Sequence, residues 1–149
     1  MIITKATEDD LKAILELQYL AYQSEAKLFN SLDIPPLKQN LQEVRSEYEK
    51  GTILKVTDED NKIVGSVRAY SENGTVYIGK LIVHPDWQRQ GIGTKLLLEI
   101  EHIYRDERYE LFTSTRSTGN IKLYEGLGYK IFKEKAINNE LKFVYLEKK

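Results

Sequence analysis

The sequence predicts an α/β fold in which a mixed β-sheet carries helices on both faces. Two helical segments come first, three β-type segments then follow one another through turn signals, and two further β-type segments are each reached through a helix. Strands joined by short turns pair antiparallel, whereas a strand reached through a helix can lie parallel to its neighbour. The predicted order of elements is therefore α-α-β-β-β-α-β-α-β-β.

The first helix is predicted within residues 4–28, where Thr7 suits the N-cap and acidic residues follow it. Its apolar positions have helical spacing at Leu11, Ile14, Leu15 and Leu17. Residues 30–36 are predicted to form a loop. A second helix is predicted to begin after Pro35-Pro36 and to end before Gly51.

The β-type segments are short, apolar and bounded by turn residues; they span residues 52–57, 63–70, 75–83, 109–114, 129–135 and 141–147. The polar residues 58–62 and the pair Asn73-Gly74 predict two hairpin turns. Two more helices are predicted over residues 92–103 and 118–127, and Gly128 is a common helix stop.

Composition narrows the possible functions. The chain has 149 residues, 41% apolar and 30% charged, which is typical of one globular domain. It contains no cysteine, which excludes disulfides and cysteine nucleophiles and suits a cytoplasmic location. A net charge of −1 and only two histidines, His84 and His102, predict no nucleic-acid partner and no metal site. No apolar run is long enough to predict a membrane span.

A glycine-flanked turn, Gln88-Arg89-Gln90-Gly91-Ile92-Gly93, connects the strand at residues 75–83 to the helix at residues 92–103. Backbone N–H groups at the start of a helix have no intrahelical partner, and the helix dipole favours an anion there. Glycine brings no side chain between those N–H groups and a ligand. The turn therefore predicts a site for a diphosphate.

Two nucleotide motifs fail at this turn. A P-loop requires Gly-x-x-x-x-Gly-Lys-Ser/Thr, whereas here Thr94 precedes Lys95 and the glycines are closer together. A dinucleotide fingerprint requires a third glycine where this chain has Leu96. One non-functional interpretation also stays open, namely that these residues form only a surface turn before a buried helix.

Residues 81–93, Leu-Ile-Val-His-Pro-Asp-Trp-Gln-Arg-Gln-Gly-Ile-Gly, resemble the acetyl-coenzyme A signature of the GCN5-related N-acetyltransferase (GNAT) family. Residues 119–129, Gly-Asn-Ile-Lys-Leu-Tyr-Glu-Gly-Leu-Gly-Tyr, resemble the second signature of that family. The resemblance implies a single GNAT domain over residues 1–149, with a mixed, mostly antiparallel and splayed sheet of about six to seven strands and helices on both faces.

The resemblance also implies acetyl-CoA as the acyl donor. Residues 89–94 are expected to hold its pyrophosphate, residues 81–83 its pantetheine arm, and Arg89, Lys95 and Lys122 its phosphates. The residues expected to bind the donor are Leu81, Ile82, Val83, Gln88, Arg89, Gln90, Gly91, Ile92, Gly93, Thr94, Lys95, Asn120, Lys122, Leu123 and Tyr124. Asn120 has an alternative role as a cap of the helix at residues 118–127.

For the chemistry, the resemblance implies Tyr124 as the general acid that protonates the leaving thiolate. Backbone N–H groups near Ile82 are expected to polarise the thioester carbonyl. Many relatives have a glutamate base near position 79, where this chain has Gly79. Another residue (Tyr22, Glu25 or Glu72) or ordered water must then carry the proton of the amine. Gly79 is also expected to favour a bulge that opens the sheet.

The acceptor is expected to be a small-molecule or peptide amine. The residues expected to line its binding site are Tyr22, Glu25, Phe29, Arg68 and Tyr70. With no cysteine to carry an acyl group, the amine would attack directly in a ternary complex. Two other functions stay open, a catalytically silent acyl-CoA-binding module and a nucleotide-binding domain. The chain is expected to be a monomer or a homodimer.

Overall fold

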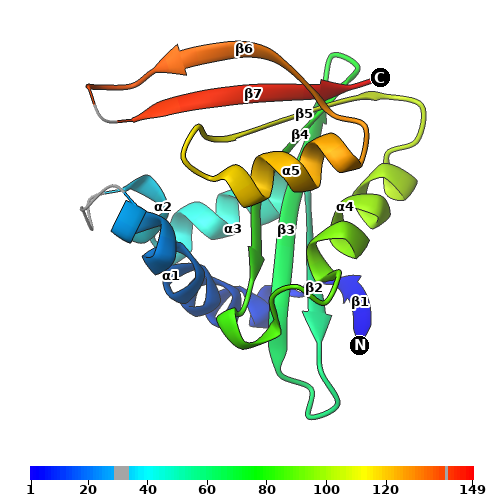
Figure 1. Cartoon of the computed structure of the whole chain (residues 1–149). Coiled ribbons are helices and arrows are strands. Elements are labelled where there is room, and N and C mark those ends of the chain that lie inside the picture. The colour runs from blue at the N-terminus through cyan, green and yellow to red at the C-terminus, as the bar shows by residue number, and fades with distance from the viewer. Residues whose placement is uncertain (29–33, 140) are drawn as a thin grey trace.

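The computed structural model describes residues 1–28, 34–139 and 141–149. Its centre is a seven-stranded sheet in the order β1-β2-β3-β4-β5-β7-β6 (Figure 1). The strands are β1 (Ile2–Lys5), β2 (Thr52–Thr57), β3 (Ile63–Glu72), β4 (Thr75–Val83), β5 (Arg108–Ser114), β6 (Lys130–Ala136) and β7 (Lys142–Lys148). Only β4 and β5 pair in parallel; the other neighbours are antiparallel. The predicted mixed, mostly antiparallel sheet is confirmed.

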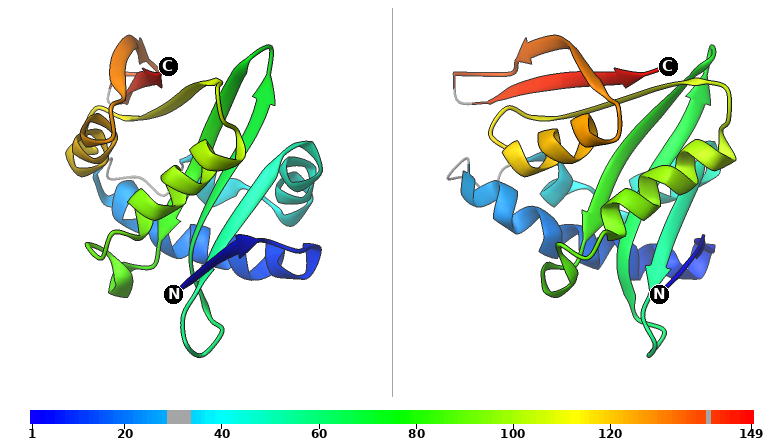
Figure 2. Two further views of the ribbon diagram at one scale, coloured as in Figure 1. Left: turned by 90° about the vertical axis from the view of Figure 1, so that its right-hand side faces the viewer. Right: turned by 45° about the vertical axis from the view of Figure 1, so that its right-hand side comes forward.

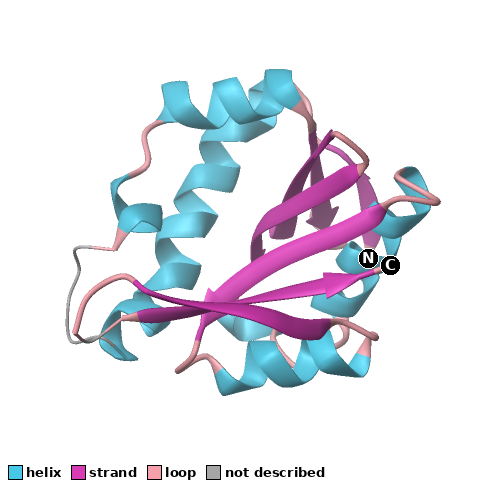
Figure 3. Cartoon of the chain, turned by 90° about the horizontal axis from the view of Figure 1, so that it is seen from above, coloured by secondary structure: helices cyan, strands magenta, loops and turns pink. Residues whose placement is uncertain are grey.

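Helices cover both faces of the sheet. They are η1 (Glu8–Asp10), α1 (Leu11–Leu28), α2 (Pro35–Lys38), α3 (Leu41–Lys50), η2 (Pro85–Trp87), α4 (Ile92–Ile103) and α5 (Thr118–Gly126). Helices α4 and α5 lie on one side of the strands and α3 on the other (Figure 2). From above, helices flank the twisted sheet on both sides (Figure 3). Helix α1 packs against β3 and β4 on the same side as α3.

The structure corrects the sequence prediction in two places. Strand β1 was not predicted, because four mostly exposed residues at the sheet edge show no clear alternation. The predicted second helix is two helices, α2 and α3, separated at Gln39 and Asn40. Asn40 accepts a hydrogen bond from the Glu43 backbone N–H, and Glu43 Oε1 accepts one from the Asn40 N–H. This capping box starts a new helix where a continuous one was expected.

The main core lies between the sheet and α4. Leu96, Leu97 and Ile100 are completely buried in it, and their spacing places them on one face of α4. Apolar residues of every strand from β2 to β5 and of β7 pack in the same cluster. This core fixes where α4 begins relative to the end of β4, which is the region that the glycine turn occupies.

The sheet opens between β4 and β5. These two strands pair over only three residue pairs, from Thr75 with Arg108 to Tyr77 with Glu110. Beyond that point β5 continues beside β7, while β4 continues beside β3 (Figure 1). Residues 78–83 of β4 therefore have an edge that no described strand covers. The splay that the family resemblance implied is present.

Candidate active site

A β-bulge lies at the point where β4 leaves β5. On β3 the partners Ser66 and Arg68 are two residues apart, whereas their partners on β4, Ile82 and Gly79, are three apart. The extra residue bends the strand, as bulges do. Lys80 has a φ of 51°, and Gly79 is outside that left-handed region. The expected bulge is present, but Lys80 adopts the unusual backbone conformation and Gly79 does not.

The turn after β4 brings the first amides of α4 to the same end of the opening. The His84 Nδ1 accepts a hydrogen bond at 3.0 Å from the Asp86 backbone N–H, which fits a corner residue better than a base. Gly91, with a φ of 79°, is the N-cap of α4 and makes no side-chain cap hydrogen bond. The first N–H groups of this 12-residue helix therefore have no capping side chain, as the diphosphate prediction requires.

Three of the predicted donor-binding residues meet beside this turn. A Cβ on Gly93 would lie 3.4 Å from Leu123 Cδ2 and 3.7 Å from Leu81 Cδ2. Leu81 comes from β4, Gly93 from the first turn of α4 and Leu123 from α5. The two predicted signatures, which are far apart in the sequence, thus lie side by side in the structure. Thr94 is half-buried, and six other polar residues predicted to bind the donor are exposed: Gln88, Arg89, Gln90, Lys95, Asn120 and Lys122.

Helix α5 presents the other predicted donor residues. Its N-cap is Ser117, so Asn120 lies inside the first turn and does not cap the helix. The Asn120 amide instead donates a hydrogen bond at 3.4 Å to Thr113 Oγ1 on β5. Tyr124 is only 6% exposed and packs with its ring centroid 6.2 Å from that of Tyr129.

The two tyrosines of the second signature have different surroundings. The Tyr129 hydroxyl donates a 2.9 Å hydrogen bond to Glu101 Oε2. Burial raises the pKa of Tyr129, and the negative charge of Glu101 raises it further. Tyr129 is thus held by Glu101 in the core, whereas Tyr124 belongs to α5 beside the opening of the sheet.

A cleft of about 490 Å³ lies over the sheet on the face opposite α4. Its lining comes from α3 and from strands β3, β4, β5 and β7: Glu47, Lys50, Arg68, Ala69, Tyr70, Tyr77, Ile78, Gly79, Lys80, Glu110, Phe112 and Tyr145. Two predicted acceptor residues, Arg68 and Tyr70, line it. The Tyr70 ring stacks on Tyr77, with centroids 5.2 Å apart.

The other predicted acceptor residues do not line the cleft or lie outside the described part of the chain. Tyr22 is nevertheless close enough to Arg68 for its charge to raise the pKa of that guanidinium. Tyr22 packs with Ala26, Ile34, Leu37 and Leu141, where the first helices meet the β6–β7 hairpin. Phe29 and the Glu25 side chain lie outside the described residues. Glu72, a candidate base, is exposed at the β3–β4 turn. This turn is at the end of β4 that pairs with β5, away from the opening of the sheet.

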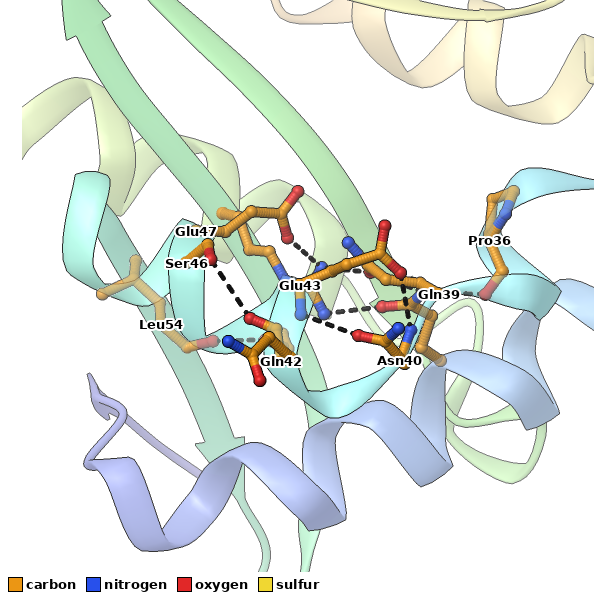
Figure 4. A network of polar contacts seen from close by, with 11 residues as sticks. Pro36, Gln39, Asn40, Gln42, Glu43, Ser46, Glu47 and Leu54 are labelled. Atoms are coloured by element: carbon orange, nitrogen blue, oxygen red, sulfur yellow. Dashed lines mark hydrogen bonds and ion pairs between the residues drawn. The ribbon is translucent and has the colours of Figure 1, made fainter.

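Arg68 is the centre of a polar network that connects β3 to α1 and α3. Figure 4 labels three members of this network, Pro36, Gln39 and Glu47. The Arg68 Nη1 donates to Glu47 Oε2 at 2.5 Å and to Gln39 Oε1 at 2.9 Å, and its Nη2 donates to Gln18 Oε1 at 2.6 Å. The Gln18 amide in turn donates to the Pro36 carbonyl at 2.8 Å. Burial lowers the pKa of Arg68, and the charge of Glu47 opposes that shift. The network holds the guanidinium rigidly in the floor of the cleft.

Four residues of the cleft and its polar network were not predicted from the sequence: Gln18, Gln39, Glu47 and Lys80. Arg68 and Lys80 are the only charged residues in residues 63–70 and 75–83, two otherwise apolar and uncharged strand segments. A lone charge inside an apolar strand is a signal, because burying it requires a partner or a ligand. Partners from α1 and α3 could not be found this way, since they are distant in the sequence.

Among the described residues, no group of three or more His, Cys, Asp or Glu side chains is arranged to hold a metal ion. In the same part of the chain, no helix is both long and apolar enough to cross a membrane.

Comparisons with known proteins agree with the fold and with both signatures. The model of the Acetyltransferase (GNAT) family matches residues 11–129. Among curated proteins, the UPF0157 protein YqkA of Bacillus subtilis (strain 168) is 28% identical over 119 residues, which are 79% of this chain and 34% of that protein. The chain thus spans about a third of the length of this relative.

Solved structures share the fold at low sequence identity. The ribosomal-protein-S18-alanine N-acetyltransferase of Escherichia coli superposes with a TM-score of 0.80 at 18% identity, covering 98% of this chain and 91% of that one. The yncA protein of Salmonella typhimurium, solved with its cofactor acetyl-CoA, has a TM-score of 0.75 at 18% identity, covering 99% of this chain and 92% of that one. With a family match over most of its length, this chain belongs to the GNAT acetyltransferase family.

Proposed function

We propose that this protein is an N-acetyltransferase that transfers the acetyl group of acetyl-CoA to a primary amine in a ternary complex. The observation that carries the proposal is the opening between β4 and β5 beside the uncapped N-terminus of α4. Family membership and the acetyl-CoA complex of the yncA protein support it.

The residues around the opening fit this donor. Main-chain groups of residues 81–83 are free to pair with the amides of the pantetheine arm, in the manner of an added strand. The α4 amides after Gly91 would bind the pyrophosphate, while exposed Arg89, Lys95 and Lys122 would neutralise phosphate charge. Glycine at position 93 leaves the space between Leu81 and Leu123 narrow but free of a further side chain.

The donor supplies an acetyl thioester at the opening. In the reaction, a bond between the amine nitrogen and the acetyl carbon replaces the carbon–sulfur bond. The Ile82 N–H would stabilise the charge that develops on the carbonyl oxygen. The Tyr124 hydroxyl would give its proton to the departing sulfur, and the proton lost by the amine would restore it through water.

Water is proposed as the carrier of the amine proton because both acidic side chains that line the cleft are in ion pairs. Position 79 has no carboxylate. The two acids in the described lining are both engaged, Glu47 with Arg68 and Glu110 with Arg108. Neither is therefore a free base.

The test measures free thiol released from acetyl-CoA over a panel of amines, for the wild type and for Tyr124→Phe. We expect amine-dependent release that falls about 10²–10⁴-fold in the variant, the usual contribution of a general acid. Tyr48→Phe, a partly buried tyrosine packed against a separate hydrophobic cluster, is the matched control and should keep full activity.

Three other outcomes have distinct meanings. Unchanged turnover in folded Tyr124→Phe would remove the general-acid role. Tight acetyl-CoA binding with no thiol release for any amine would favour the catalytically silent acyl-CoA-binding module. A thermal shift with ATP or NAD equal to that with coenzyme A would favour a nucleotide-binding domain.

A further inference from the structure

In the cleft of about 490 Å³ described above, which we propose binds the acceptor, the acidic side chains have cationic partners but Lys80 has no anionic partner among the described residues. Of the described lining residues, Glu47 and Glu110 are acids, and each has a cation close by: Glu47 Oε2 lies 2.5 Å from Arg68 Nη1, and Glu110 Oε1 lies 2.9 Å from Arg108 Nη1. Lys80 is a cation of the same lining, and its Nζ makes no hydrogen bond or salt bridge with any described residue. The cleft therefore has an unbalanced positive charge.

The position of Lys80 makes this imbalance unusual. It is partly buried in the bulge of β4, next to the open edge that faces the donor site. Burial lowers the pKa of Lys80; Arg68 lowers it further, while Glu43 and Glu47 on α3 oppose the shift. Taking an ammonium group out of water without a partner costs free energy, and an oxyanion is the partner that recovers it.

Arg68 is a second cation of the same lining. It is 5% exposed, and its Nε is buried without a hydrogen-bond partner in the described structure. Its ion pair with Glu47 compensates its own charge but leaves that N–H unused. Lys50 adds a third cation at the rim, with its Nζ 3.9 Å from the centre of the Tyr70 ring.

We infer that the acceptor is a small primary amine that also carries an oxyanion group, foremost a carboxylate, which binds Lys80 in this cleft. This inference rests on the proposed acetyl transfer and names its substrate class. The cleft volume of about 490 Å³ is suited to a small ligand. A Cβ on Gly79 would meet nothing within 4 Å, so there is room for such a group beside Lys80. The stacked rings of Tyr70 and Tyr77 offer an apolar wall to the rest of the molecule.

The experiment compares pairs of amines that differ only in the anion: L-phenylalanine with 2-phenylethylamine, L-lysine with cadaverine, β-alanine with ethylamine, and O-phosphoethanolamine with ethanolamine. The last pair separates phosphate from carboxylate recognition. For at least one carboxylate pair we expect kcat/KM to be about tenfold to hundredfold higher for the anionic member, as one charged hydrogen bond provides.

Two variants test whether Lys80 is responsible. Lys80→Met removes the charge and Lys80→Arg keeps it, so the preference should be lost in the first and retained in the second. Gly79→Glu places a carboxylate in the empty space beside Lys80 and should abolish the preference without altering Lys80 itself. Lys12→Met, an exposed lysine on α1, is the matched control and should leave the preference unchanged.

A binding measurement avoids dependence on turnover. Calorimetric titration with 3-phenylpropanoate, which has the anion but no amine, should show binding to the wild type and to Lys12→Met and none to Lys80→Met. Equal or better acetylation of the plain amines, or a preference for the anionic amines that is unchanged in Lys80→Met, would overturn the inference while leaving acetyl transfer intact. No acetylation of any amine would instead overturn the proposed function, and the titration would still decide the anion site.

Discussion

The two faces of the sheet contain different kinds of residue, although the same strands form both. Towards α4, the strands contribute apolar side chains such as Val67, Val76 and Leu111, all buried in one core. On the opposite face, alternate positions of the same strands provide Arg68, Tyr77 and other residues of the cleft. Since side chains alternate across a strand, one segment serves both roles.

We propose that the apolar face serves mainly stability and that the opposite face recognises the acceptor. The apolar face fixes α4 and with it the glycine turn that we propose holds the donor. The polar face has a buried arginine network and a lysine that makes no hydrogen bond or ion pair with a described residue, and we propose that these residues determine which acceptor binds. Substitutions on the two faces should therefore have different consequences, and the following predictions test that.

The largest effect is expected for the apolar face. Leu97→Ala removes a completely buried side chain of α4 and should lower the free energy of unfolding by about 2–5 kcal/mol. Leu98→Ala, on the same helix but 47% exposed, should change it by less than about 0.5 kcal/mol. Urea denaturation measures both values, and equal effects would contradict the core described for α4.

On the polar face, Arg68→Met should cost about 2–3 kcal/mol of unfolding free energy, because it leaves the buried Gln18 amide oxygen and Glu47 without their partner. Glu47 can turn to water, which limits the loss. The matched control is Arg105→Met, an exposed arginine after α4. A stable Arg68→Met variant with unchanged acceptor KM would mean that the network has no role in either stability or binding.

At the donor site, Arg89→Glu should weaken acetyl-CoA binding by about tenfold or more, and added salt should reduce the difference. Arg105→Glu makes the same charge change at the far end of α4, away from the glycine turn, and should leave affinity unchanged. Titration calorimetry at two salt concentrations measures the effect. Equal affinities of wild type and Arg89→Glu would remove Arg89 from the phosphate site.

The smallest effect is expected at the Asp10–Lys55 pair beneath the first helices, where the atoms lie 2.8 Å apart. Burial raises the pKa of Asp10, but hydrogen bonds from Lys55 and Thr7 outweigh it and lower the pKa overall. A lowered carboxylate pKa stabilises the fold above the pKa of the unfolded chain, and this contribution is lost as pH falls through the folded value. Asp10→Asn should therefore lower the urea midpoint slightly near pH 7, and the difference should vanish in acid.

Much of the fold was predictable because its signals are local. Helical spacing gave α1 and α4, and Asn73-Gly74 gave the β3–β4 turn. Strand β1 was missed because a four-residue edge strand has too little pattern. The break between α2 and α3 had a signal, Asn40 with Glu43 three residues later, but the proline pair that precedes it suggested one longer helix.

The site was predictable only in part. The donor side has sequence signatures, and the structure brings Leu81, Gly93 and Leu123 together as expected. On the acceptor side, the partners of Arg68 come from α1, α3 and the segment between helices, which no periodicity connects. The bulge of β4 was expected from Gly79, but the sequence did not indicate that Lys80, which has no partner on β3, would be the residue with a left-handed conformation.

The most direct test of the account is product analysis after incubation with acetyl-CoA and an amine that also carries a carboxylate. Transfer across the opening from one face of the sheet to the other predicts one N-acetylated amine for each coenzyme A thiol released. Thiol release without the N-acetylated product, or product formation that is equally fast in Tyr124→Phe, would contradict it.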